Sequence, residues 1–380
     1  MTLVYLVAGE QSGDVLGARL MAALRAARPD IRFAGVGGPR MQAQGLQSLF
    51  PMRDLAVMGL AEVLPRLALL RRRMAETVAD IEAKRPDVVV TVDSPGFGLR
   101  LLRRVPKFRR VQYVAPQAWG WREGRVRKFP GLWDKLLCLL PFEPGFFAGH
   151  NLQASFVGHP VLESGADRGD ARSFRSRHNL ADAPLLILMP GSRHSEISRL
   201  LPVYRAALER LRARLPGLAV AMPLSANVAE AVRSEVTSWP TPPILVTDLA
   251  EKHDAYAAAS AAITKSGTST LELALAGVPM VVAYRVHPIT AALVRRMLTL
   301  PHVAMVNVLA RREVVPELLQ ENCTPENLAS TAEALITDPA RAAAQRAAFL
   351  DIVASLAPKG RLPSAAAAAE ILALLDGASS

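Results

Sequence analysis

Residues 3–21, LVYLVAGEQSGDVLGARLM, determine how the first half of the chain is read. The run LVYLVA predicts a buried strand, and a helical pattern follows the next few residues. Gly9 and Ser12 are typical of the turn that begins a phosphate-binding loop in an α/β fold. The turn nevertheless carries two carboxylates, Glu10 and Asp14, which would repel a phosphate.

This turn also matches neither common nucleotide motif, because it lacks both the G-x-G-x-x-G spacing and the G-K-[ST] of a P-loop. Asp14 is predicted to cap N–H groups at the helix N-terminus. Glu10 precedes the turn and is predicted to face a cleft, where it can hold sugar hydroxyls or help position a base. A structural carboxylate at position 10 is the alternative.

Apolar strands alternate with alanine-rich helical patterns in two successive series. The strands are expected in LVYLVAGE, IRFAGVGG, VVVTVDSP and RVQYVAP, then in LLILMPGSR, LAVAMPLS, PILVTD, AAITKSG and PMVVAYR. This pattern predicts an α/β protein with two Rossmann-like, doubly wound parallel-sheet domains and a cleft between them. A polar stretch after FVGHP separates the series, which gives domains at 1–162 and 163–345. Residues 346–380 are expected to form C-terminal helices that can pack back on the N-terminal domain.

The composition limits the class of protein and its partners. The formal net charge is +11, so phosphorylated substrates, an acidic membrane face or nucleic acid are the expected partners. The two cysteines form no disulfide or zinc pattern and fit a reducing compartment. The N-terminus lacks a signal-peptide pattern, and no window of eighteen apolar residues is free of charge or proline. We therefore expect a cytoplasmic protein, soluble or peripherally attached to a membrane.

Polar residues at strand ends are the candidate site residues, because ligands of open α/β sheets bind beyond the carboxyl ends of the strands. In VVVTVDSPGFG, Asp93 follows a buried strand, which suits a general base; a helix cap is the alternative. In APQAWGWREGRVRKF, Trp119 and Trp121 lie beside Arg122 and a basic helical pattern, which suits an amphipathic phosphorylated ligand. Core tryptophans with a solvated arginine face are the alternative there.

Two strand-end loops of the second half predict anion sites. In LMPGSRHSEI, Gly191, Ser192 and Arg193 combine backbone N–H groups, a positive helix end and a forked guanidinium. The loop in AAITKSGTSTLELAL consists of small and hydroxyl residues, namely Ser266, Gly267, Thr268, Ser269 and Thr270. This loop can bind a diphosphate, and Glu272 can accept from a ribose diol. The nucleotide site is therefore expected in the second domain.

These motifs together resemble the lipid-A-disaccharide synthase family, the GT-B enzymes of glycosyltransferase family 19. The matching segments are VAGEQSGDVLGARLM, FAGVGGPRM, MRDLAVMGLAEVL, VDSP, YVAPQAWGWR, LPFE, VGHPV, PGSRHSEI, KSGTSTLELAL, PMVVAYR and NVLARREVVPELLQENC. They occur in the family's order and cover most of the chain, which makes the set far more specific than any single motif.

The resemblance implies an inverting transfer in lipid A (lipopolysaccharide) biosynthesis of a Gram-negative bacterium. UDP-2,3-diacylglucosamine would donate its sugar to the 6-hydroxyl of 2,3-diacylglucosamine 1-phosphate, giving the β-1,6-linked lipid A disaccharide 1-phosphate and UDP. Inversion needs a base on the acceptor hydroxyl and stabilisation of the departing diphosphate.

The resemblance also implies roles for individual residues. The family's important aspartate falls on Asp93, and Glu10 matches a family carboxylate, so both are expected to be catalytic. The PGSR arginine falls on Arg193 and the late asparagine on Asn307, which join the UDP-sugar-binding residues. The first domain would bind the acylated acceptor. Its expected contacts are Ser12, Gly13, Trp119, Trp121 and Arg122.

The chain departs from the family directly after this aspartate. The family usually reads Ala-Pro-Asp-Phe-Asn there, whereas this chain has Ser-Pro-Gly-Phe-Gly, with Gly96 and Gly98 in place of the Asp and the Asn. If either lost group assists the base, this chain compensates elsewhere or is slower.

Neither a cofactor nor a metal is expected. No Asp-x-Asp pair is present to hold a divalent ion on the diphosphate, and Arg193 with two helix N-termini can supply positive potential instead. The sequence leaves the oligomeric state open, with a homodimer as one option.

An apolar segment that ends in three arginines predicts contact with the cytoplasmic face of the inner membrane. Its expected membrane-associated residues are Val57, Met58, Leu60, Leu64, Leu67, Leu70, Arg71, Arg72 and Arg73. A core-packed helix with a basic end is the alternative.

Three other functions fit parts of the sequence. Another GT-B-like UDP-GlcNAc enzyme, a 2-epimerase or a muramyl-pathway transferase, fits the general fold, although VAGEQSGD and YVAPQAWGWR do not resemble its signatures. A nucleic-acid-binding protein is suggested by charge alone and leaves the anion loops unexplained. An NAD-linked dehydrogenase fits least, since no glycine fingerprint exists.

Overall fold

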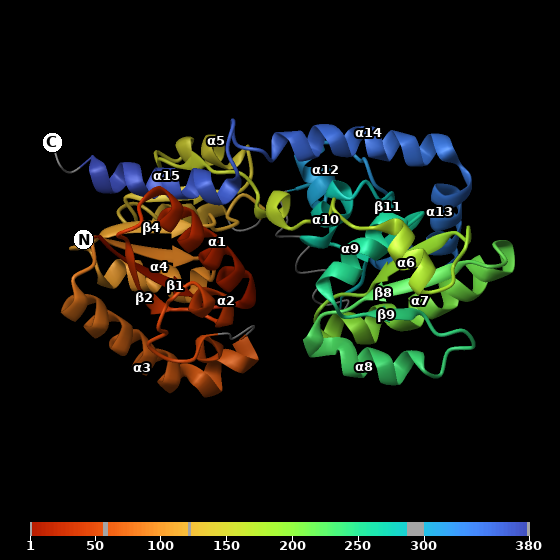
Figure 1. The fold of residues 1–380 in the computed structure, drawn as a ribbon, viewed down its shortest axis with the longest axis horizontal. Coiled ribbons are helices and arrows are strands. Elements are labelled where there is room, and N and C mark those ends of the chain that lie inside the picture. Colours follow the sequence, from red (N-terminus) through yellow and green to blue (C-terminus); the bar gives the residue numbers. More distant parts are fainter. Residues whose placement is uncertain (1, 56–59, 121–122, 287–299, 378–380) are drawn as a thin grey trace. The chain divides into compact units, whose positions relative to one another are not determined.

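The computed structural model describes residues 2–55, 60–120, 123–286 and 300–377, with the backbone alone for residues 60–65. The chain forms two compact units. Unit 1 comprises Met1–Pro160 and Leu356–Ser380, and unit 2 comprises Val161–Ser355. Over the described residues, each unit has a six-stranded sheet in which all strand pairs are parallel, with helices on both faces (Figure 1). The predicted α/β class with two doubly wound sheets is therefore confirmed.

Unit 1 begins with the predicted strand and helix. Its elements are β1 (Leu3–Ala8), α1 (Gln11–Ala27), β2 (Arg32–Val36), α2 (Pro39–Ala43), η1 (Met52–Asp54), α3 (Leu60–Lys84), β3 (Val88–Val92), α4 (Pro95–Arg104), β4 (Arg109–Tyr113), η2 (Glu123–Lys128), β5 (Lys135–Cys138), α5 (Glu143–Ala148), β6 (Ser155–Phe156) and α15 (Pro363–Asp376). The strand order is β2-β1-β3-β4-β5-β6. The order reverses between β1 and β3, so the carboxyl ends of these two strands form the topological switch point where ligands of such sheets bind.

Side-chain alternation along β1 builds a core on each face of the sheet. Val4 and Leu6 pack in a cluster with residues of α1, whereas Tyr5 and Val7 pack in one with residues of α4. The cluster on the α1 side also contains residues of α15, among them Ile371. The predicted C-terminal group of helices is therefore divided, because α15 lies in unit 1 and α14 in unit 2.

Unit 2 repeats the arrangement. Its elements are η3 (Pro160–Glu163, which starts at the last residue of unit 1), α6 (Ala171–Arg177), β7 (Leu185–Met189), α7 (His194–Arg214), β8 (Ala219–Pro223), α8 (Ala226–Val236), β9 (Ile244–Val246), α9 (Leu249–Ala258), β10 (Ala261–Lys265), α10 (Ser269–Leu275), β11 (Met280–Tyr284), α12 (Met305–Ala310), β12 (Glu317–Leu319), η4 (Gln320–Asn322), α13 (Pro325–Thr337) and α14 (Pro339–Ser355). The order β12-β11-β10-β7-β8-β9 reverses between β7 and β10. The PGSR loop follows β7 and the KSGTST loop starts at the end of β10, so both flank the switch point of this sheet.

One side of the second sheet is covered by long amphipathic helices. Residues of α7, α8 and α13 form a single core cluster with the strands. Among the described residues, no helix has the length and apolar character needed to cross a membrane.

Candidate active site

The switch point of unit 1 brings two predicted residues together. Asp93 is the first residue after β3, and its Oδ2 accepts a 3.0 Å hydrogen bond from the hydroxyl of Ser12, in the first turn of α1. The side chain of Asp93 is half-buried. Asp93, the predicted base, and Ser12, a predicted contact of the acceptor substrate, therefore form a hydrogen-bonded pair.

Two glycines allow this pair to form. A Cβ at Gly9 would lie 2.5 Å from Oγ of Ser94, and one at Gly13 would lie 3.2 Å from the carbonyl oxygen of Val92. Glycine at both positions lets the β1–α1 turn lie against the end of β3. Gly13, predicted as an acceptor contact, is buried and serves this packing.

The two carboxylates of the opening loop have different surroundings. Glu10 is the N-cap residue of α1, with a half-exposed side chain that does not cap the helix. Asp14 is 2% exposed and accepts the N–H groups of Gly38, Arg40 and Met41 at 2.8–3.0 Å. The prediction that Asp14 caps its own helix is therefore wrong, since these groups belong to the N-terminus of α2.

Trp119 is anchored within unit 1. Its indole Nε1 donates to Oε1 of Glu143 at 2.9 Å, and its ring packs edge-on against Phe142 at 4.9 Å between centroids. Oε2 of Glu143 accepts the N–H groups of Leu139 and Leu140. Burial raises the pKa of Glu143 to about 7, and the three donors oppose that rise. The other predicted contacts of this loop, Trp121 and Arg122, lie outside the described residues.

Glu143, which holds the indole of Trp119, was not singled out from the sequence. The signal available was the LPFE motif at residues 140–143, which places a carboxylate directly after a Pro-Phe pair in the loop that follows β5.

Unit 2 has a pocket of about 340 Å³ at the carboxyl ends of β7, β8, β9 and β10. Its lining residues are Met189, Gly191, Ser192, Pro223, Leu224, Ser225, Val246, Thr247, Asp248, Leu249, Lys252, Lys265, Thr268 and Ser269. Four of them, Gly191, Ser192, Thr268 and Ser269, were predicted to bind the UDP-sugar. The two lysines were not singled out from the sequence.

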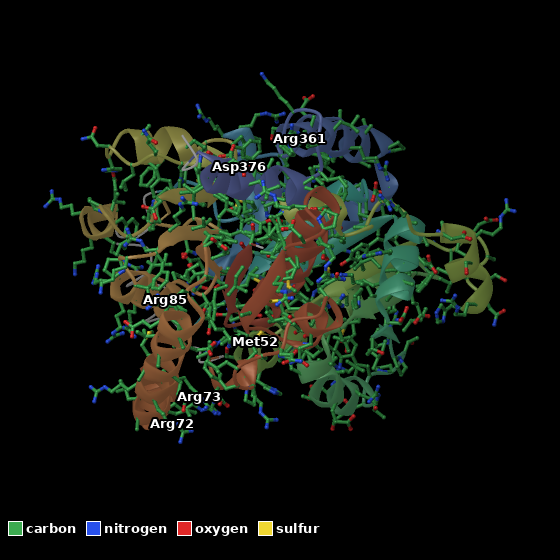
Figure 2. The ribbon with its side chains drawn as sticks, turned by 60° about the vertical axis from the view of Figure 1, so that its left-hand side comes forward. Met52, Arg72, Arg73, Arg85, Arg361 and Asp376 are labelled. Carbon is green, nitrogen blue, oxygen red and sulfur yellow. The ribbon has the colours of Figure 1, made fainter. Side chains whose placement is uncertain are left out.

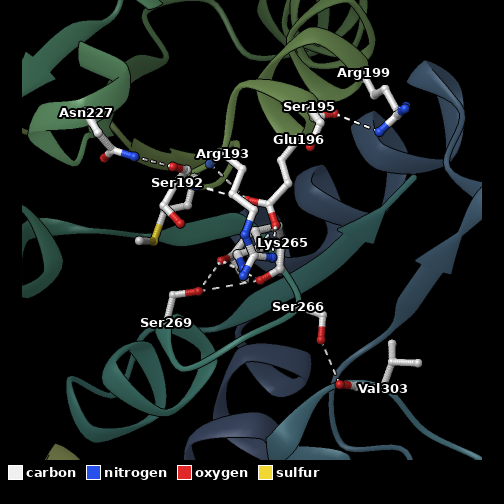
Figure 3. A network of polar contacts seen from close by, with 12 residues as sticks. Ser192, Arg193, Ser195, Glu196, Arg199, Asn227, Lys265, Ser266, Ser269 and Val303 are labelled. Atoms are coloured by element: carbon white, nitrogen blue, oxygen red, sulfur yellow. Dashed lines mark hydrogen bonds and ion pairs between the residues drawn. The ribbon is translucent and has the colours of Figure 1, made fainter. Parts of the chain in front are cut away.

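Glu196 occupies the N–H groups that the PGSR loop was expected to offer (Figure 3). Its Oε2 accepts from the N–H of Ser192 at 3.0 Å and from that of Arg193 at 3.3 Å. Its Oε1 lies 3.4 Å from both Nη1 of Arg193 and Nζ of Lys265. The predicted anion site made of loop N–H groups is therefore wrong for these two groups. The cationic groups in the pocket lining are the side chains of Lys252 and Lys265, and the side chain of Arg193, next to the lining residue Ser192, is 56% exposed.

The second loop is only partly directed at the pocket. The hydroxyl of Ser266 donates to the carbonyl of Val303 at 2.7 Å, and the buried Thr270 hydroxyl donates to the carbonyl of Gly267 at 2.8 Å. Ser266 and Thr270 are thus structural, whereas Thr268 and Ser269 line the pocket. A Cβ at Gly267 would lie 3.0 Å from Nζ of Lys265, so glycine makes room for that ammonium.

Glu272 lies beside this pocket without lining it. Its Oε2 pairs with Nζ of Lys252 at 3.0 Å and accepts from the hydroxyl of Tyr256 at 3.5 Å. A ribose diol would therefore have to share this carboxylate with Lys252, which itself lines the pocket.

Asn307 is a structural residue, in contrast to its predicted role in binding the UDP-sugar. Its side chain is fully buried. Nδ2 donates to the carbonyl of Val315 and to Oε1 of Glu317, and Oδ1 accepts the N–H groups of Val314 and Val315. These bonds use the full hydrogen-bonding capacity of the amide. Glu317 in turn accepts the N–H groups of residues 303 and 304, so Asn307 supports the segment that receives Ser266.

The predicted membrane segment is described only in part. Val57 and Met58, and the side chains of Leu60 and Leu64, lie outside the described residues, while Leu67 is half-buried. Leu70 is half-buried and packs against the unit 1 core, so part of its side chain is left for its predicted membrane contact.

The three arginines of this segment also differ from one another. Arg73 binds Asp54 at 2.6 Å and Glu76 at 2.7 Å, so its charge is already paired within unit 1 and less available to the predicted anionic headgroups. Arg71 and Arg72 are exposed, and Figure 2 shows Arg72 near Arg73.

Comparison with known proteins agrees with this geometry. Residues 4–371 match the family described as lipid-A-disaccharide synthetase. The lipid-A-disaccharide synthase of Gluconobacter oxydans is 58% identical over 377 residues, which cover 98% of this chain and 91% of that protein.

Solved structures share the fold at low sequence identity. MnaA of S. aureus, solved with UDP, has a TM-score of 0.68 at 14% identity, and the match covers 99% of this chain and 97% of the MnaA chain. The calicheamicin glycosyltransferase CalG4 has a TM-score of 0.57 at 18% identity, and the match covers 99% of this chain and 98% of the CalG4 chain. The high identity to the synthases does not favour the alternative of another UDP-GlcNAc enzyme. The chain therefore belongs to the lipid-A-disaccharide synthase family and is a UDP-sugar-dependent glycosyltransferase of lipid A disaccharide synthesis.

Proposed function

We propose that the chain transfers 2,3-diacylglucosamine from its UDP conjugate to the 6-hydroxyl of 2,3-diacylglucosamine 1-phosphate, with Asp93 as the general base. Asp93 takes the hydroxyl proton while the oxygen attacks the anomeric carbon, and the bond from that carbon to the UDP oxygen breaks with inversion. The observation that carries this role is the hydrogen bond from Ser12, which holds Oδ2 of Asp93 at the switch point of unit 1. A carboxylate held through one oxygen can accept a proton on the other. Glu10, at the same edge of the sheet, assists in holding the acceptor.

The UDP-sugar binds at the pocket of unit 2. Support comes from its position at the switch point and from the lysines at positions 252 and 265 in its lining. Together with Arg193 they would stabilise the charge that develops on the leaving diphosphate. A neighbour of the same fold was solved with UDP, which agrees with a nucleoside diphosphate as ligand.

The acylated acceptor binds unit 1, and the protein works at the cytoplasmic face of the inner membrane. Arg71 and Arg72 are exposed at the predicted membrane segment and would contact anionic headgroups. Sedimentation with vesicles tests this: binding to anionic vesicles should exceed binding to neutral ones and fall in the double variant Arg71→Gln/Arg72→Gln. Equal binding to both vesicle types would refute the electrostatic contribution. A homodimer is testable by light scattering.

Release of UDP from the two lipid substrates tests the catalytic proposal. Asp93→Asn should lower kcat by about 10²–10⁴-fold, the usual contribution of a general base. Asp87→Asn is the matched control, because its carboxylate precedes the amino end of the same strand and accepts only the N–H of Leu3 among the described residues. Full activity of Asp93→Asn would move the base elsewhere, with Glu10 as the next candidate.

A further inference from the structure

Gln112 lies in β4, beside strand β3, which ends directly before Asp93, and its side chain is fully buried. Its Nε2 lies 3.3 Å from the carbonyl oxygens of Asp93 and Tyr113 and 3.0 Å from that of Val114. One amide thus ties the end of β3 to the end of β4 at the edge of the sheet that carries the proposed base.

The backbone at these strand ends is strained. Asp93 and Ser94 have φ values of 54° and 43°, and Val114 has a φ of 77°. The left-handed region is unfavourable for residues with a Cβ and most unfavourable for a β-branched residue such as valine. Such strain persists only where surrounding contacts hold it, and it clusters at functional sites. The carbonyls bound by Gln112 include those of two left-handed residues, Asp93 and Val114.

The amide of Gln112 is itself held in one orientation. The hydroxyl of Thr91, buried in β3, donates to Oε1 of Gln112 at 2.7 Å, which directs Nε2 towards the three carbonyls. Helix α4 closes over the pair, because a Cβ at Gly98 would lie 3.1 Å from Cβ of Thr91 and 3.5 Å from Oε1 of Gln112.

We propose that Gln112, oriented by Thr91, is a positioning residue for Asp93: it holds the left-handed turn that presents the carboxylate. The inference rests on the proposed role of Asp93 as base. Displacement of a catalytic group by about 1 Å can cost on the order of 10²-fold in rate, so loss of this tie acts on kcat rather than on substrate binding.

The test compares Gln112→Met, which keeps the side-chain length without the amide, in wild-type and Asp93→Asn backgrounds. We expect kcat for UDP release to fall roughly 30-fold in the wild type, with KM for both substrates changed less than about 3-fold. In the Asp93→Asn background the further loss should be below about 3-fold, because the two residues act as a unit.

Gln345→Met is the matched control. Gln345 is also buried and also holds backbone groups of a strand, namely the N–H and carbonyl of Met280 in unit 2. Its loss should lower the melting temperature and leave kcat unchanged.

The outcomes separate the two proposals. If Asp93→Asn keeps the wild-type rate, the proposed base is wrong and the inference falls with it. Two results would overturn the inference alone, provided that Asp93→Asn itself lowers kcat. One is that Gln112→Met lowers kcat by the same factor in both backgrounds, and the other is that it leaves kcat unchanged. Should Gln112→Met fail to fold, Thr91→Val provides the test, since it leaves the amide in place without its orienting bond. That variant should lose roughly 5-fold in kcat, and an unchanged kcat would overturn the inference.

Discussion

The hydroxyl of Ser12 donates a 3.0 Å hydrogen bond to Oδ2 of Asp93, and thereby joins the first turn of α1 to the end of β3. This contact explains why the opening loop has glycines but no phosphate-binding character. The glycines let the loop approach Ser94 and Val92, and the hydroxyl of Ser12 meets a carboxylate of the protein instead of a bound phosphate.

Ser12→Ala should lower kcat by roughly 10-fold, less than Asp93→Asn, because it removes the orienting bond and keeps the base. Steady-state rates of UDP release give the comparison, with Ser12→Thr as the variant that retains a hydroxyl. A Ser12→Ala enzyme with normal kcat but a raised KM for the acceptor would instead favour direct contact of Ser12 with substrate.

Arg193→Ala should raise the KM for the UDP-sugar and lower kcat, for a combined loss of about 10²–10³-fold in kcat/KM. Arg193→Lys should recover only part of that loss, since an ammonium cannot form the forked contact. The control is Arg205→Ala, which changes a half-exposed arginine further along α7 and should behave as wild type. Equal kinetics of the Arg193 and Arg205 variants would exclude Arg193 from the diphosphate site.

Asn307→Ala should destabilise unit 2 by about 2–4 kcal/mol, because it leaves buried N–H and carbonyl groups without partners. Urea unfolding followed by circular dichroism measures this change. Unaltered stability together with a raised KM for the UDP-sugar would restore the role in ligand binding that the sequence suggested.

Glu143 predicts a pH-dependent contribution to stability. Its pKa rises from 4.5 to about 7 on folding, chiefly through burial, so the folded state favours the protonated form. The contribution of Glu143 to the free energy of unfolding is fully present below about pH 4.5 and is lost as pH rises through 7. The total change is at most about 3 kcal/mol. The stability of the wild type relative to Glu143→Gln should therefore fall between pH 5 and 8. A pH-independent difference, like that expected for the exposed Glu230→Gln, would contradict this.

Transfer should persist in EDTA, because positively charged side chains can stabilise the leaving diphosphate without a metal ion. Among the described residues no group of three or more His, Cys, Asp or Glu could hold a metal. Loss of UDP release in EDTA with recovery on adding Mg²⁺ would show that a metal takes part.

The strands that the sequence predicted are those with the clearest apolar runs. β5 and β12 were missed, since four and three residues are too few for a periodic signal. These strands extend each sheet away from its switch point, so their omission did not affect the placement of the site.

The sequence predicted those site residues whose position depends on where a strand ends. It did not predict which side chains bind the loop N–H groups or each other. Strand-end positions identified Asp93 and the PGSR loop. The sequence could not show that Glu196 accepts the loop N–H groups. Nor could it show that the Asn307 amide bonds only to groups of unit 2, because both depend on how the folded segments pack. Lys252 was overlooked because it lies in the charged stretch AEKHD, and Lys265 because it stands alone at the end of the apolar run AAITK.

The return of α15 to unit 1 has a consequence for synthesis on the ribosome. Unit 2 is continuous from Val161 to Ser355, whereas the core on the α1 side of unit 1 contains Ile371. The ion pair between Arg28 and Asp376 joins the same two segments at 2.6 Å. Domains generally fold as units as they emerge. Unit 2 can therefore complete its fold first, and the unit whose strand β1 is made earliest is the last to close its core.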